Sequence, residues 1–145
     1  MTRIAFQTAM RTAAVAFLED YRDSAGITLS VYRARPRHLA PPHAFVESIG
    51  ETISYTALNQ RQPRAEIVVV HGLFDSGAAA DQRDGFIDGL IDWSFDRFHQ
   101  AGANTTVAIV SIDDDPVYVP DWLPEGERQA YYATRITLEG LALSG

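Results

Sequence analysis

The sequence contains no cysteine, which excludes a disulfide framework, a thiolate nucleophile and any cysteine-ligated zinc or iron–sulfur site. It contains no lysine either, so all twelve basic residues are arginine. No apolar run approaches the roughly 20 residues that a membrane span requires. Polar residues interrupt the apolar stretch between Thr2 and Leu18, which disfavours a cleaved targeting peptide. We therefore expect a soluble protein without a membrane segment.

Charge is unevenly distributed along the 145 residues, which are enough for one domain with a single core. Residues 1–40 carry six arginines against three acids, a charge of +3. Residues 41–145 carry six arginines against sixteen acids, a charge of −10, and the two parts give the net charge of −7. An acidic protein has little of the basic surface that supplies most nucleic-acid affinity. Tight binding to nucleic acid is not expected.

Two segments have the periodicity of amphipathic helices. In residues 3–24 apolar side chains recur at steps of three and four, and Gly26 is placed to end the helix. This apolar stripe consists of Phe6, Met10, Ala13, Ala14, Phe17 and Tyr21. The second predicted helix covers residues 76–100, with Asp75 or Ser76 as N-cap and Gly102 just beyond its end. Its apolar stripe consists of Phe86, Ile87, Leu90 and Phe98.

The remaining regular segments have the pattern of strands, with alternation of side chains or unbroken β-branched runs. The predicted strands are residues 28–33, 44–49, 51–56, 67–71, 105–112 and 131–138. Two proline-containing stretches, residues 35–43 and 116–124, are expected to form connecting arms. The pattern predicts one α+β domain over residues 1–145, with a mixed, mostly antiparallel sheet packed against two main helices.

Residues 68–77 resemble the strand and His-Gly turn near the oxyanion hole of α/β-hydrolases, with His71 at the turn. Such an enzyme also needs a Gly-x-Ser-x-Gly elbow that exposes the nucleophile. No serine has this setting: Ser94 lies between Trp and Phe, and Ser111 between Val and Ile. His99, the one histidine after His71, is expected inside the second helix. We expect a strand that ends in a glycine turn, and no catalytic residues.

The acidic run at residues 113–115 offers oxygen ligands for a hard cation, but no acid follows at calcium-loop spacing. A solvated turn before Pro116 is the favoured interpretation. His38 and His43 lie in a loop without an acidic neighbour in sequence. Neither a Gly-x-Gly-x-x-Gly motif nor a P-loop occurs. We expect no metal and no cofactor.

An acidic stripe follows the second predicted helix, with Asp81 near its start. Its members recur every four residues and are Asp84, Asp88, Asp92 and Asp96. Like charges at this spacing cost a few tenths of a kcal/mol per pair. The stripe indicates a solvated face, or a surface that repels an anion or meets a basic partner. Gly85 and Gly89 lie beside it, and their small size suggests close approach by a neighbouring subunit.

The second arm carries three large side chains, Tyr118, Trp122 and Leu123, between prolines. The sequence around them is too irregular for us to expect burial in a sheet. Aromatic residues on stiff loops make good interface anchors, because little entropy is lost when they dock. The alternative is that the arm folds back over its own core.

The order of these segments resembles that of the tail terminator (tail completion) proteins of long-tailed bacteriophages. The resemblance covers nearly the whole chain and includes an N-terminal helix followed by strands, RAEIVVVH at residues 64–71 and ADQRDGFIDGLID at 80–92. It continues with SIDDD at residues 111–115 and YYATRITLEG at 131–140. These motifs are short, and the family has no catalytic residues to carry over.

The resemblance implies a virion protein that assembles in the host cytoplasm as a ring, typically a hexamer. Such a ring caps the tail tube protein, ends tube polymerisation and meets the head–neck connector protein, and double-stranded DNA passes through its lumen. We hypothesise that Asp84 to Asp96 line the lumen and that the arm around Trp122 contacts the next subunit. Three alternatives are another neck or head–tail connector subunit, a small hydrolase-like enzyme that uses His71, and a monomeric binding domain.

Overall fold

A computed structural model describes residues 3–38, 41–53, 61–74, 76–94, 99–100 and 105–142 of the chain. The helices are α1 (Arg3–Ala25) and α2 (Gly77–Ser94), with a short 3-10 helix η1 (Glu125–Glu127). The strands are β1 (Ser30–Tyr32), β2 (His43–Ile53), β3 (Arg61–Leu73), β4 (His99–Gln100), β5 (Thr105–Tyr118) and β6 (Tyr131–Ala142).

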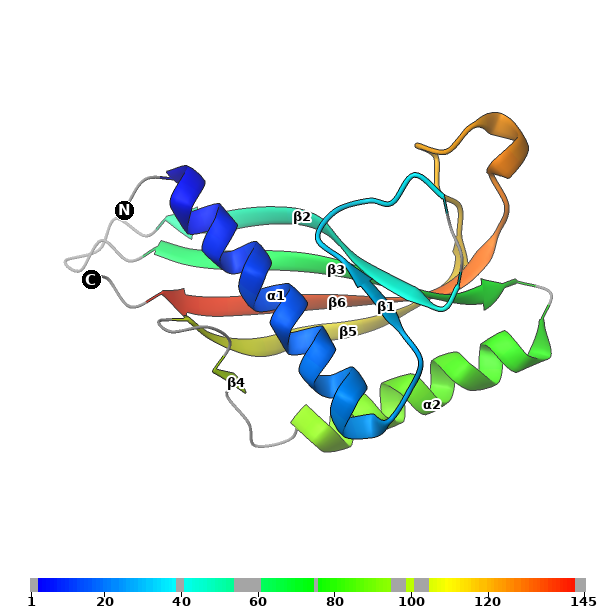
Figure 1. The fold of residues 1–145 in the computed structure, drawn as a ribbon, viewed down its shortest axis with the longest axis horizontal. Coiled ribbons are helices and arrows are strands. Elements are labelled where there is room, and N and C mark those ends of the chain that lie inside the picture. Colours follow the sequence, from blue (N-terminus) through cyan, green and yellow to red (C-terminus); the bar gives the residue numbers. More distant parts are fainter. Residues whose placement is uncertain are drawn as a thin grey trace.

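The strands form a sheet in the order β1-β2-β3-β6-β5-β4 (Figure 1). β1 runs parallel to β2, and the other neighbouring pairs are antiparallel. Side chains of both helices join one buried cluster with the strands, so α1 and α2 cover the same face of the sheet. The predicted α+β class, with a mixed and mostly antiparallel sheet packed against two main helices, is confirmed.

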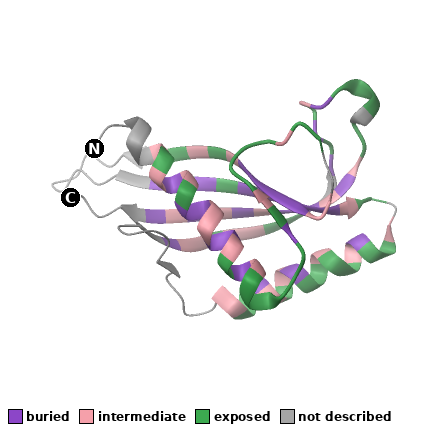
Figure 2. Cartoon of the chain, in the orientation of Figure 1, coloured by how far each residue is buried: buried purple, intermediate pink, exposed green. Residues whose placement is uncertain are grey.

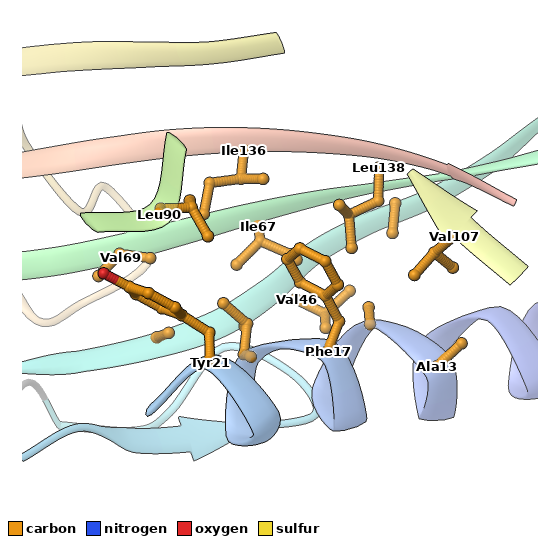
Figure 3. Packing of buried hydrophobic residues seen from close by; sticks show 14 of the residues in the cluster. Ala13, Phe17, Tyr21, Val46, Ile67, Val69, Leu90, Val107, Ile136 and Leu138 are labelled. Carbon is orange, nitrogen blue, oxygen red and sulfur yellow. The ribbon is translucent and has the colours of Figure 1, made fainter. Parts of the chain in front are cut away.

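The main core lies between this helical layer and the sheet (Figure 3). The stripe predicted for α1 is buried from Met10 to Tyr21, whereas the side chain of Phe6 lies outside the described residues. α2 contributes Phe86 and Leu90. The strands contribute alternate residues, as a pleated sheet requires, which include Val46, Ile67, Val69, Ile136 and Leu138.

A second, smaller cluster lies on the opposite face of the sheet. It consists of Phe45, Val68, Val70, Tyr118, Tyr131 and Ala133, with Trp122 packed against it. The central strand β3 is therefore buried on both faces over part of its length, as the purple segments of the sheet show (Figure 2). This explains why its sequence is an unbroken apolar run there, since a strand with one solvated face alternates instead.

β2, β3, β5 and β6 are each longer than the strands predicted there, and the extensions of β2 and β5 change how their segments are interpreted. β2 continues through Gly50, which pairs with Arg64 of β3, so the two predicted short strands are one. β5 continues through the acidic run, where Asp113 pairs with Arg135 and Asp114 with Thr134 of β6. The predicted turn before Pro116 is therefore wrong, because pairing with β6 keeps this polar segment extended.

The structure describes α2 as far as Ser94, whose hydroxyl donates to the Ile91 carbonyl at 3.4 Å. Residues 95–98 and Gly102 lie outside the described residues. The predicted helix extends too far, because His99 and Gln100 belong to β4. The predicted N-cap is confirmed, because the Ser76 hydroxyl accepts from the Ala79 amide at 3.2 Å.

Candidate functional site

The exposed side of α2 carries the acidic stripe. Asp81, Asp84, Asp88 and Asp92 are all exposed, and we call these four residues the acidic face. They lie opposite Phe86 and Leu90, which face the core. Asp96, the fourth predicted member of the stripe, lies outside the described residues.

Among the described residues, Arg83 is the one arginine that forms an ion pair with the acidic face. Arg83 pairs with the adjacent Asp84 at 3.1 Å, but its guanidinium also lies over the Tyr132 ring, 4.9 Å from the centroid. This stacking draws the cation toward the sheet. The acidic face therefore presents a row of solvated carboxylates to whatever lies beside α2.

The two glycines of α2 have different surroundings. A methyl group added at Gly89 would collide with the hydroxyl oxygen of Tyr21, and the tyrosine ring carbon Cζ would lie 3.6 Å away. At Gly85 an added methyl group meets no atom within 4 Å. A close approach at Gly89 is therefore made within the subunit, by Tyr21 of α1. Gly85 remains open to a partner.

The second arm packs over its own core. Tyr118 and Leu123 are buried, and Trp122 is half-buried. The Trp122 indole lies 5.4 Å from the Phe45 ring, and its Nε1–H donates to the Pro36 carbonyl at 3.2 Å. The expectation that an irregular arm leaves these side chains uncovered is wrong, because the cluster around Phe45 provides an apolar surface on the second face of the sheet.

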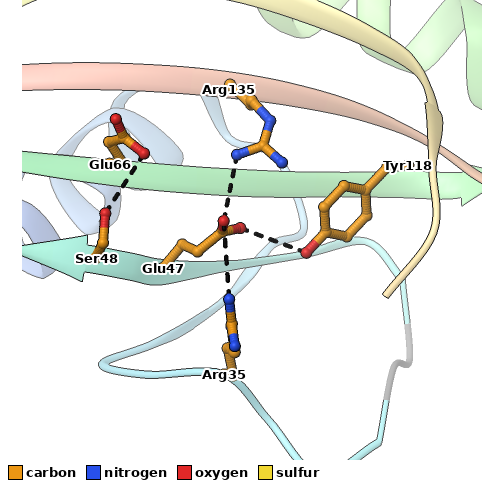
Figure 4. A network of polar contacts seen from close by, with 6 residues as sticks. All are labelled: Arg35, Glu47, Ser48, Glu66, Tyr118 and Arg135. Atoms are coloured by element: carbon orange, nitrogen blue, oxygen red, sulfur yellow. Dashed lines mark hydrogen bonds and ion pairs between the residues drawn. The ribbon is translucent and has the colours of Figure 1, made fainter. Parts of the chain in front are cut away.

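Glu47 joins the two arms to the sheet (Figure 4). Its carboxylate accepts from Arg135 at 3.3 Å and from the Tyr118 hydroxyl at 3.4 Å, and it lies 3.9 Å from Arg35. Arg35 also stacks on the Trp122 indole at 4.9 Å. We call these five residues the Glu47 network. Its charged hydrogen bonds hold the first arm, the second arm, β2 and β6 in one arrangement.

The electrostatics of the Glu47 network follow from partial burial. The Glu47 side chain is only 16% exposed. Burial, and then the carboxylate of Glu47, raise the pKa of Tyr118, while Arg135 and Arg35 oppose that shift. The phenol is therefore a neutral hydrogen-bond donor at physiological pH. A cavity of about 390 Å³ beside the network is lined mainly by its members and by Asp121.

Sequence reasoning missed Glu47 because its partners Arg135 and Tyr118 are 88 and 71 positions away in the sequence. Glu47 itself follows the alternation of β2, since it lies on the same face as Phe45, which packs with Tyr118 in the smaller cluster. The β-bulge between Val46 and Ser48 brings Ser48 onto that face as well. Ser48 bonds Glu66 at 3.4 Å on the same face (Figure 4). The one available signal was a lone acid within the apolar stretch of residues 44–49.

His71 also lies at a register shift, between Val70 and Gly72. The side chain is buried, its Nε2 lies 2.8 Å from Thr134 Oγ1, and its ring packs edge-on against Phe86. Burial, and then the nearby Arg83, lower the pKa of His71 to about 4, so the imidazole is neutral at pH 7. His71 therefore acts as a neutral, packed side chain.

A cavity of about 600 Å³ reaches His71 from the space between α2 and the chain that follows α1. Tyr21, Leu29, Pro42 and Phe86 supply much of its apolar wall, and Thr134 is not among its lining residues. Thr134 is fully buried. The only hydroxyl partner found for His71 is therefore out of reach of a substrate in this cavity.

The other polar candidates are dispersed in the described part of the chain. His43 is fully buried between the rings of Tyr32 and Phe45, at 5.6 and 6.1 Å, and His38 is exposed. Among the described residues, no group of three or more histidine, aspartate or glutamate side chains could hold a metal ion. No described helix is both long and apolar enough to cross a membrane.

Comparisons with known proteins do not place the chain in a family. No protein-family model matches the sequence, and no curated protein matches it significantly. The functional argument therefore depends on the fold, the acidic face and the contacts described above.

Proposed function

We propose that this protein is a structural virion subunit of a long-tailed bacteriophage, a tail terminator that assembles into a ring of about six copies. In this role the ring caps the tail tube, ends its polymerisation and joins the tail to the head–neck connector. The chain acts through contacts with copies of itself, with tail tube protein and with connector protein, and it catalyses no reaction.

The observation that carries the proposal is the acidic face of α2. Repelling carboxylates in successive turns disfavour the helix, and within the described part of the chain the partly diverted Arg83 is the one arginine that pairs with them. A surface of this charge is useful where a polyanion must pass without adhering. We propose that Asp84, Asp88 and Asp92, together with Asp96, face the lumen through which double-stranded DNA passes.

The surroundings of His71 favour assembly over hydrolysis. A triad needs a nucleophile within reach of both the base and a substrate, and the hydroxyl beside His71 belongs to the fully buried Thr134. Another neck or connector subunit would share the size, the ring and the acidic lumen. The distinguishing property of a terminator is its action on the growing tube.

Native mass spectrometry of the purified chain, alone and with tail tube protein, tests the ring. We expect a closed oligomer of about six copies. Electron microscopy of polymerising tube protein tests the terminator function, since added chain should bind tube ends and shorten the tubes. A chain that remains monomeric even with tube protein contradicts the ring, and a ring that leaves tube length unchanged points to a connector subunit instead.

The lumen placement has its own test. Replacing Asp84, Asp88, Asp92 and Asp96 by asparagine should leave the ring intact but increase its binding to double-stranded DNA, measured by fluorescence anisotropy at low salt. A matched control replaces four exposed acids elsewhere, Asp20, Asp23, Asp121 and Glu125, by amides. Equal DNA binding by the two variants, or acidic side chains that point outward in a structure of the ring, would contradict the placement.

A further inference from the structure

The β5 edge of the sheet is open over most of its length. Among the described residues, β4 pairs with β5 only at Thr106 and Val107, and β5 continues to Tyr118 with no strand on its outer side. Val110 is 52% exposed, and Asp113 and Asp114 are exposed. We call Val110, Asp113 and Asp114 the acidic edge.

The acidic edge is suited to side-chain contact more than to addition of another strand. The register of β5 against β6 shifts next to Val110 and again before Tyr118. Bulges and charged residues are the devices that keep an edge strand from pairing with other strands. A partner is therefore expected to meet the carboxylates and Val110, and not the backbone.

The opposite edge of the sheet is formed by β1 and is basic. The Arg11 guanidinium donates to the Arg33 carbonyl, and Arg33 donates to Thr12 Oγ1 at 3.1 Å. Both arginines thus bond neutral oxygens and keep their positive charge at this edge. Arg33 is exposed, and Tyr32 is 41% exposed. We call Arg11, Tyr32 and Arg33 the basic edge.

These two edges are complementary and lie at opposite ends of the strand order. Each combines like charges with one exposed large apolar side chain, and their signs are opposite. From this arrangement we infer that the basic edge of one subunit docks against the acidic edge of the next copy of the chain. This inference depends on the proposed ring and names the surfaces that build it.

The contact is heterologous, because two different surfaces meet at each junction. Contacts of this type close into a ring when the rotation between copies allows it. The charges fix the direction and register of the contact, and they suppress contacts between two like edges. The acidic face of α2 takes no part in the junction and remains available to the lumen.

Charge reversal with complementation tests the inference. The acidic-edge variant carries Asp113→Arg and Asp114→Arg, and the basic-edge variant carries Arg11→Glu and Arg33→Glu. In a ring of either variant alone, like charges would meet at every junction. We expect each variant to be monomeric by native mass spectrometry. An equimolar mixture should recover the ring, because each reversed edge meets the complementary reversed edge of the other variant. The ring should contain equal numbers of the two chains.

A matched control reverses two acids on α2, Asp81→Arg and Asp88→Arg, and should leave the ring intact. Circular dichroism shows whether each variant is folded. If the edge variants still form rings alone, or if a mixture of folded variants stays monomeric, edge docking is wrong while the wild-type ring still stands. If only the α2 variant dissociates, the basic edge docks on α2 instead. A monomeric wild-type chain overturns the ring and the docking together.

Discussion

Gly89→Ala is expected to destabilise the subunit by about 2 kcal/mol, although alanine is the better helix former. The substitution gains about 1 kcal/mol in helix propensity. Against this gain, the Tyr21 hydroxyl must withdraw from the new methyl group and release its 3.2 Å hydrogen bond to the Phe86 carbonyl, which costs about 1 kcal/mol. The ring must also shift against Phe86 and Trp93, both 5.3 Å away between centroids. Overpacking of this kind costs about 1–3 kcal/mol.

Gly85→Ala, one turn earlier, is the matched control. An added methyl group meets no atom there, so this variant should gain up to about 1 kcal/mol. Urea unfolding followed by circular dichroism measures both changes, and repeating it at two protein concentrations separates subunit stability from assembly.

Tyr21→Phe identifies the cause of the Gly89 effect. Without the hydroxyl, the nearest tyrosine atom to the added methyl group is Cζ at 3.6 Å, an ordinary contact. Gly89→Ala should therefore become neutral or stabilising in this background, with a coupling energy of about 2–3 kcal/mol in the double-mutant cycle. If Gly89→Ala stabilises the wild-type chain as much as Gly85→Ala does, the packing argument is refuted.

Two further predictions concern the buried polar groups. Burial lowers the pKa of His71 to about 4, so between pH 6.5 and 4 the unfolded chain binds a proton that the folded chain does not. Stability should fall by up to about 3 kcal/mol as pH falls through this window, and His71→Gln, compared by urea unfolding across pH, should remove that part of the dependence. Glu47→Gln should lower the free energy of unfolding by about 1–2 kcal/mol, because Arg35 and Arg135 lose their shared carboxylate. The loss should be smaller in an Arg135→Ala background, and an equal loss in both backgrounds would contradict the coupling between Glu47 and Arg135.

The sequence predicts a helix well where its apolar stripe continues over several turns. α1 follows from an apolar stripe sustained over five turns, and its predicted end differs by one residue from the observed Ala25. The second predicted helix extends too far, because its last two residues, His99 and Gln100, pair with β5 as β4. Strand pairing of this kind is not encoded in the periodicity of a single segment.

The strand ends and the arm could not be predicted, because both depend on partners distant in sequence. The polar end of β5 is extended only through its pairing with β6. Trp122 is covered only because Phe45, 77 positions earlier in the sequence, lies beneath it. The roles of Glu47 and His71 could not be predicted for a related reason: their partners Arg135 and Thr134 lie 88 and 63 positions away in the sequence.

The arginines of the folded subunit fall into two groups, those that pair with acids and those that lie at the basic edge. Arg35 and Arg135 pair with Glu47, and Arg64 pairs with Glu139 at 2.7 Å, so these arginines are neutralised within the subunit. The arginines of the basic edge bond neutral oxygens instead. The separation of charge adds little to the stability of an isolated subunit, because exposed charges are solvated and screened. In a head-to-tail ring, opposite charges attract at every junction and stabilise the assembly. The ring should therefore dissociate more readily as the salt concentration rises.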